Sequence, residues 1–186
     1  NKADGSKAYV KTDSGVHYVD IALPYTLRWQ PEDKFPEGFY SSISFVFGLV
    51  SRINKTGYFL NAPENNMSWP GYLGGGYHYM KINGKWKSAD GSVAPFNLHS
   101  GIGQDRDLSG NIIGFIDNTF TVELPLKNFT IKADASNTIG LSMNVNNWFV
   151  GPHVFDFNVY GGSVMQNQQV QELLKENGAD VFNVVR

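Results

Sequence analysis

The sequence predicts a mostly β protein, an antiparallel β-sandwich with one C-terminal α-helix. Aromatic residues make up 14% of the chain and glycine occurs 20 times, a composition that favours strands joined by turns. Short segments of alternating apolar and polar residues follow one another, bounded by Gly, Asn and Asp. Helical periodicity is found only late in the chain. Because 186 residues suit one domain of ordinary size, we expect residues 1–186 to form a single domain.

The expected elements follow from the positions of the turn residues. Strands are predicted at residues 8–10, 16–23, 39–49, 77–86, 94–100, 112–116, 119–124 and 139–145, with a last strand or extended tail at 181–185. Long loops are expected at 24–36 and 54–76 and a polar turn at 101–110. Asn83 with Gly84 and Asp90 with Gly91 are typical hairpin turns. Ser163 is expected to cap a helix that runs to Asn177.

The N-terminal segment predicts a shortened domain. Asp4 with Gly5 is a hairpin-type dipeptide, so the first recognisable feature is a turn rather than a strand. We therefore expect the strand before this turn to be missing. A lost edge strand exposes unpaired backbone N–H and C=O groups, so we expect self-association through the free sheet edge.

Composition excludes several classes of protein. The net charge is −2 and no basic block occurs, so we expect no nucleic-acid partner. No apolar run approaches the roughly 18 residues of a membrane helix, so no transmembrane segment is expected. Cysteine is absent, which excludes disulfides, thiolate metal sites and cysteine nucleophiles.

Motifs for catalysis are also missing, and we expect no enzyme. No G-x-S-x-G nucleophile motif occurs. The glycines at 74–76 lead into a predicted strand and lack a following Lys-Ser/Thr, unlike a phosphate loop. Residues 105–110 resemble a calcium loop but lack its later glutamate, so a solvated turn is expected there.

Several stretches, taken together in order and spacing, resemble the MbnP-like family over nearly the whole chain. They are residues 16–20 (VHYVD), 63–70 (PENNMSWP), 74–81 (GGGYHYMK), 96–99 (FNLH), 143–149 (MNVNNWF) and 160–165 (YGGSVM), followed by the helix and residues 180–182 (DVF). The resemblance implies a β-sandwich exported to the bacterial periplasm or cell surface, often as a lipoprotein anchored through its N-terminus. Relatives from methane-oxidising bacteria bind copper through two histidines and a kynurenine, formed when a dihaem peroxidase-like partner oxidises a tryptophan.

The resemblance implies a metal site at His17 and His99, which correspond best in order and separation to the family's ligand pair. Imidazole suits copper and zinc, and two histidines on neighbouring strands could share one ion. Water, Asp20 or Asn97 would complete the coordination. A histidine on a sheet is more often bonded to a neighbouring group, and this alternative stays open. His78 is expected to share a face with Met80 and Ile82 and to bond a backbone carbonyl, and the fourth histidine, at 153, to lie in a solvated turn.

The family's tryptophan lies two positions before a ligand histidine, and here those positions hold Gly15, Gly76, Asn97 and Gly151. Trp69 is the nearest candidate, with a lid over the sandwich edge as the alternative. A second hypothesis is a glycan- or ligand-binding module, in which Trp69, Tyr72 and Trp29 in loops stack on the ligand. A third is a docking module of a surface assembly that uses residues 166–171.

Overall fold

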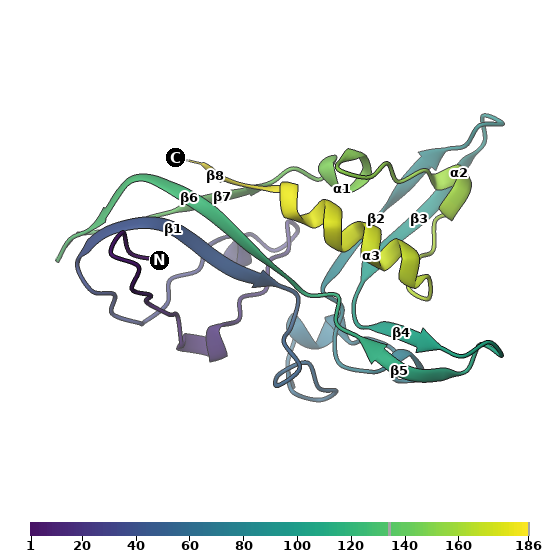
Figure 1. The fold of residues 1–186 in the computed structure, drawn as a ribbon, viewed down its shortest axis with the longest axis horizontal. Coiled ribbons are helices and arrows are strands. Elements are labelled where there is room, and N and C mark those ends of the chain that lie inside the picture. Colours follow the sequence, from purple (N-terminus) through teal and green to yellow (C-terminus); the bar gives the residue numbers. More distant parts are fainter. Residues whose placement is uncertain (134, 186) are drawn as a thin grey trace. The chain divides into compact units, whose positions relative to one another are not determined.

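The computed structural model describes residues 1–133 and 135–185 (Figure 1). It confirms a mostly β fold with antiparallel strand pairs and one long C-terminal helix, consistent with a β-sandwich. The strands are β1 Gly38–Phe47, β2 Met80–Lys87, β3 Val93–Ser100, β4 Gly103–Arg106, β5 Ile112–Ile116, β6 Phe120–Ile131, β7 Gly140–Met143 and β8 Phe182–Val185. The α-helices are α1 Asn147–Val150, α2 Phe157–Tyr160 and α3 Gln168–Asn177.

The chain divides into two compact units. Unit 1 comprises Asn1–Ser44, Glu123–Leu141 and Val184–Arg186, and unit 2 comprises Phe45–Val122 and Ser142–Asn183. The described strands pair as β1 with β6, β2 with β3, β4 with β5, and β7 with β8. None of the described helices combines the length and apolar character that crossing a bilayer requires.

In unit 1, the two strands predicted at residues 8–10 and 16–23 are absent. Residues 8–10 and 16–23 form no regular element, and each is followed by a short 3-10 helix, Thr12–Gly15 and Pro24–Leu27. Local polar bonds take the place of strand pairing here. Just after residues 8–10, the Asp33 carboxylate accepts the backbone N–H groups of Lys11 and Thr12, each at 2.9 Å. Within 16–23, the Thr26 hydroxyl oxygen accepts the Asp20 N–H at 2.9 Å. Side chains therefore satisfy backbone donors that a neighbouring strand would otherwise take.

In unit 2, the hairpin of β2 and β3 corrects one predicted turn. Asn83 and Gly84 lie inside β2, opposite Asn97 and Phe96, and the chain reverses at the other predicted turn, Asp90 with Gly91. A Cβ on Gly84 would lie 2.7 Å from the Phe96 ring, so the glycine makes room for an aromatic side chain across the strand pair. A turn signal was thus overridden by cross-strand packing.

The remaining strands confirm the predictions in part. β5 lies where it was predicted, whereas β6 continues past the predicted end at residue 124 to Ile131. The expected polar turn at 101–110 contains β4, which pairs with β5, and only residues 107–110 form the turn. There the Asp107 carboxylate accepts the backbone N–H groups of Ser109 and Asn111, as in a solvated turn.

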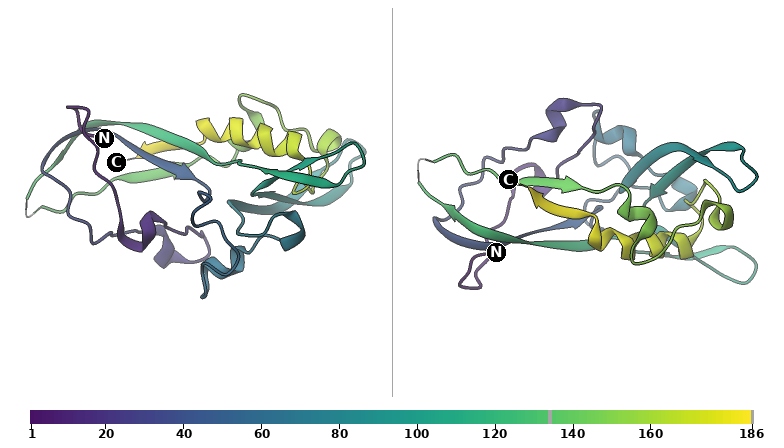
Figure 2. Two further views of the ribbon diagram at one scale, coloured as in Figure 1. Left: turned by 60° about the horizontal axis from the view of Figure 1, so that its bottom comes forward. Right: turned by 90° about the horizontal axis from the view of Figure 1, so that it is seen from above.

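Helix α3 begins at Gln168, five residues after the predicted cap at Ser163. Its N-cap is Asn167, whose Oδ1 accepts the Val170 N–H at 3.2 Å. Val170 and Leu174 are buried, as the predicted apolar stripe requires, while Leu173 is only half-buried. Figure 1 shows the hairpins β2–β3 and β4–β5 projecting from the end of unit 2 where α3 begins. The right-hand view of Figure 2, from above, shows them as two separate arms.

The main core lies in unit 2, between α3 and the β2–β3 hairpin. It consists of Met80, Leu98, Trp148, Phe155, Val164, Val170, Leu174 and Val181. A second set of buried apolar residues from the segment before β2 comprises Ile53, Trp69, Leu73 and Tyr77. The latter set fixes the segment that enters β2, and this segment carries His78.

Candidate functional site

His78 and His99 lie together in unit 2, with ring centroids 5.0 Å apart and planes at 82°. His99 is on β3, opposite Lys81 of β2, so its side chain faces away from the core residue Leu98. His78 precedes β2 and is 8% exposed. We call these two side chains the imidazole pair.

The pair forms because the strand alternation stops before β2. Sequence alternation predicts His78 on the face of Met80 and Ile82, which both pack in the core. However, the backbone bends at Tyr79, and β2 begins only at Met80. His78 therefore lies against His99 on the outer side of the hairpin, and the predicted common face with Met80 is wrong.

His78 is held by the loop that precedes it. Its Nδ1 lies 2.9 Å from the carbonyl oxygen of Met67, and its backbone N–H donates to the same oxygen at 2.6 Å. The predicted bond to a backbone carbonyl is thus confirmed. Nε2 is buried and has no hydrogen-bond partner among the described residues. A buried polar atom without a partner costs about 1–3 kcal/mol. The indole N–H groups of Trp29, Trp86 and Trp148 are also buried without a partner in the described part of the chain, but only the histidine nitrogen has a lone pair that could bind an ion.

His99 is held from two directions. Its Nε2 lies 2.8 Å from Oδ1 of Asn83, which is two residues after Lys81 on the same face of β2. From the other side, the buried Gln171 of α3 donates through Nε2 to the His99 carbonyl oxygen at 2.9 Å. The long helix therefore fixes the backbone of the strand that carries the imidazole.

Both imidazoles are kept neutral by their surroundings. Burial lowers the pKa of His78, opposed by the hydrogen bond to the Met67 carbonyl. Burial lowers the pKa of His99 to about 4, and repulsion from the Lys81 cation, and from His78 whenever it is protonated, acts in the same direction. Neutral imidazole is the form that binds metal ions.

The separation of the rings suits a shared ion. Two imidazoles bound to one ion through bonds of about 2.0–2.1 Å, at an angle of about 100–110°, have centroids roughly 5 Å apart. The observed 5.0 Å fits this arrangement. Within residues 1–133 and 135–185, no group of three or more His, Cys, Asp and Glu side chains could hold an ion, so further ligands would have to be water or neutral groups.

Trp69 lies beside the imidazole pair. Its ring centroid is 4.7 Å from that of His78, edge to face, and its Nε1 donates to the Leu73 carbonyl oxygen at 3.1 Å. The side chain is 3% exposed. The nearest tryptophan candidate in the sequence is therefore next to a histidine in space, although it lies nine residues before it in the chain.

His17, the other predicted ligand, belongs to unit 1. Its Nε2 lies 2.7 Å from the Thr26 carbonyl oxygen, and its ring stacks on Trp29 with centroids 5.1 Å apart. The predicted pairing with His99 joins residues of different units and stays a prediction. Asp20, proposed to complete that site, is also in unit 1, where its carboxylate accepts the Ala22 N–H at 2.8 Å and the Tyr18 hydroxyl at 3.0 Å.

The other predicted ligand-contact residues have different surroundings. Tyr72 is 72% exposed and lines a surface pocket of about 360 Å³ with Leu73, Ser163, Met165, Gln166 and Asn167. Trp29 is half-buried beneath His17. Tyr72 therefore offers an open aromatic face, whereas Trp69 is covered.

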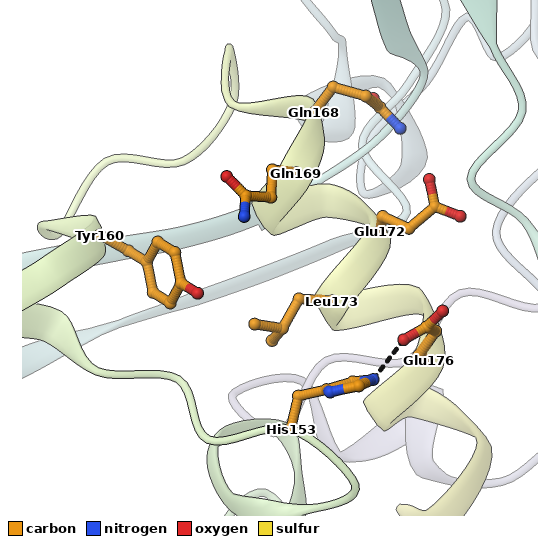
Figure 3. Close-up of a pocket in the computed structure, with 7 residues that line it drawn as sticks. All are labelled: His153, Tyr160, Gln168, Gln169, Glu172, Leu173 and Glu176. Atoms are coloured by element: carbon orange, nitrogen blue, oxygen red, sulfur yellow. Dashed lines mark ion pairs between the residues drawn. The ribbon is translucent and has the colours of Figure 1, made fainter.

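A second pocket of about 400 Å³ lies along α3 (Figure 3). Leu173 forms an apolar patch between the ring of Tyr160 and His153, and His153 forms an ion pair with Glu176. The lining of this pocket is completed by Gln168, Gln169 and Glu172. His153 is exposed, as predicted, but this contact with α3 was not foreseen.

Comparison with known proteins supports the family suggested by the motifs. The MbnP family model matches residues 1–169, most of the chain. No curated protein and no solved structure matches the sequence. On the strength of the family match, the chain belongs to the MbnP family.

Proposed function

We propose that this protein binds a copper ion between His78 and His99 and is a binding protein rather than an enzyme. The observation that carries the proposal is the buried Nε2 of His78, which has no partner among the described residues and lies beside a second neutral imidazole. Membership of the MbnP family supports a role in metal or ligand binding.

The chemistry of the site favours copper among the divalent and monovalent metals. A nitrogen-donor site binds copper more tightly than the other first-row divalent metals, and imidazole is a suitable ligand for it. Neither pKa is influenced by a carboxylate, and the permanent charge that acts on both imidazoles is the cation of Lys81. Because the site has no negative ligand, the charge of a bound ion is not neutralised there. Burying one positive charge costs less than burying two, which favours monovalent copper over zinc.

Two imidazoles bound at an angle of about 100–110° leave coordination positions on the ion for water or for another ligand. Asn97, proposed from the sequence to complete the site, is two residues before His99 on the same face of β3 and is exposed. Trp69 is placed next to His78, so oxidation of this tryptophan by a partner, as in the copper-binding relatives, would occur beside the ion.

Copper titration of the purified protein tests the proposal. We expect one equivalent to bind, and replacement of either His78 or His99 by Ala to weaken binding by more than about 100-fold, because loss of a ligand exceeds the 10–100-fold effect of losing a ligand's partner. His153→Ala is the matched control and should bind as wild type. Circular dichroism and thermal unfolding verify that each variant is folded.

His17→Ala separates the two histidine pairs. If His78 and His99 hold the ion, His17→Ala binds copper within about 2-fold of wild type, below the effect of even an indirect partner. If it loses binding while His78→Ala keeps it, the pair predicted from the sequence is correct. Absence of copper and zinc binding by wild type at micromolar protein concentration would refute both.

A second candidate function is recognition of a glycan or similar small ligand. It is favoured by the open ring of Tyr72 in a pocket lined by Ser163, Gln166 and Asn167, whose polar groups suit hydroxyl-rich ligands. A glycan array with wild type and Tyr72→Ala tests it. Hits that vanish in the variant support the function, and an array without hits removes it.

Export to the periplasm or cell surface is also proposed, because the family relationship supports it. Fractionation of cells that express the complete gene product, with detection by antibody, checks the location. Recovery in the cytoplasmic fraction alone would contradict export.

A further inference from the structure

The two imidazoles of the pair are held in opposite tautomers. The Met67 carbonyl oxygen and the Asn83 amide oxygen accept hydrogen bonds but donate none, so the nitrogen next to each carries the proton. His78 is therefore protonated on Nδ1 and His99 on Nε2. The lone pairs that remain for an ion are on Nε2 of His78 and on Nδ1 of His99.

Asn83 has no evident role in the sheet itself. Asn is disfavoured in strands, and this one is exposed in the middle of β2 next to Gly84. Among the described residues, its side chain makes one hydrogen bond, the 2.8 Å bond to His99. The side chain of Asn83 thus reaches diagonally across the strand pair to the imidazole of His99.

The geometry points to Asn83 as a positioning residue that holds His99 for metal binding through Nδ1, with His78 binding through Nε2. This inference rests on the proposed copper site. Partners that hydrogen-bond the distal nitrogen of a ligand histidine fix its tautomer and ring orientation. Here a neutral amide serves one histidine and a backbone carbonyl serves the other, and neither adds negative charge to the site.

Nitrogen NMR on ¹⁵N-histidine-labelled protein tests the assignment. Without metal, we expect the proton on Nδ1 of His78 and on Nε2 of His99. With monovalent copper, which is diamagnetic, the shifts of Nε2 of His78 and Nδ1 of His99 should change most. Binding through Nε2 of both histidines would overturn the inference and leave the copper site intact.

Variants at Asn83 provide the second measurement. Asn83→Leu should weaken copper binding about 10–100-fold, the effect expected for the partner of a ligand histidine. Asn83→Asp keeps an acceptor for the His99 proton and should restore at least wild-type affinity. Lys85→Leu, at the next outward-facing position of β2, is the control and should bind as wild type.

The outcomes distinguish the two levels of the proposal. If wild type binds no copper, the titration refutes the proposed function. The positioning role of Asn83, which rests on that function, is then refuted as well. If wild type binds copper and Asn83→Leu binds it equally tightly, only the positioning role of Asn83 fails. Thermal unfolding of Asn83→Leu close to wild type shows that weakened binding is not a loss of folding.

Discussion

Two long segments without β-strands, residues 8–36 of unit 1 and residues 54–79 of unit 2, use the same three groups in different ways. Each contains a histidine, a tryptophan packed on it and a backbone carbonyl oxygen bonded to the ring. In unit 1, His17 stacks flat on Trp29 with an interplanar angle of 3°. In unit 2, His78 meets Trp69 edge to face and has His99 as a further neighbour.

The difference lies in what holds each segment. Residues 8–36 are tied by polar bonds, and Thr26 is their one buried residue among those described. Residues 54–79 are tied by buried aromatic and aliphatic side chains, among them Trp69, Leu73 and Tyr77. A histidine set in an apolar layer loses its water, and a nitrogen left without a partner there is available for an ion.

Truncation of the two tryptophans should give the largest contrast. Trp69→Ala should lower the free energy of unfolding by about 3–5 kcal/mol, because it removes a buried indole and leaves a cavity. Trp29→Ala should cost less than half as much, since this ring is only half-buried. Urea unfolding measures both. Equal losses would show that the two segments are packed alike.

Overpacking beside Trp69 should have the next largest effect. A Cβ on Gly101 would lie 2.7 Å from the indole ring, so Gly101→Ala should destabilise by about 1–3 kcal/mol. Gly71→Ala is the control, because a Cβ there meets nothing within 4 Å. Thermal unfolding compares the variants, and an unchanged midpoint for Gly101→Ala would contradict the tight contact.

Loss of one hydroxyl should loosen residues 8–36. The Thr26 hydroxyl shares its one proton between the carbonyl oxygens of Leu23 and Asp20, at 2.8 and 3.0 Å, and its oxygen accepts the Asp20 N–H at 2.9 Å. Thr26→Val keeps the shape and removes these bonds, so stability should fall by about 1–2 kcal/mol. Hydrogen exchange should quicken at Asp20 and stay unchanged at Tyr77. Unchanged exchange at both would mean that these polar bonds do not order the segment.

The pH dependence of stability tests whether His99 is shielded from water in the folded protein. The unfolded state binds a proton near pH 6.5, whereas the folded pKa of His99 is lowered to about 4. The unfolded chain therefore holds more protons between these values, and the free energy of unfolding falls as the pH drops from 6.5 to 4. His99→Gln should reduce this slope in metal-free protein, and an equal slope in the variant would contradict a shielded imidazole.

The sequence by itself determined the fold class, the late helix and the family. Alternation within 94–100 and 119–124 was sufficient for strands, because each places one apolar face in the interior, with Leu98 and Val122 buried. It could not predict that Asn83 and Gly84 lie within a strand, because the local turn preference was overridden by the Phe96 ring across the hairpin. It also predicted strands at 8–10 and 16–23. In the second of these, a side-chain acceptor, the Thr26 hydroxyl oxygen, takes the Asp20 N–H instead of a neighbouring strand.

The candidate site was decided by tertiary structure. The sequence showed that His99 was a ligand candidate and that Trp69 was the nearest tryptophan, but His78 was assigned to the core face by strict alternation. One bend at Tyr79 reverses that assignment, because it interrupts the alternation before β2 begins at Met80. Only the folded chain therefore brings His78 beside His99 and leaves its Nε2 without a partner among the described residues.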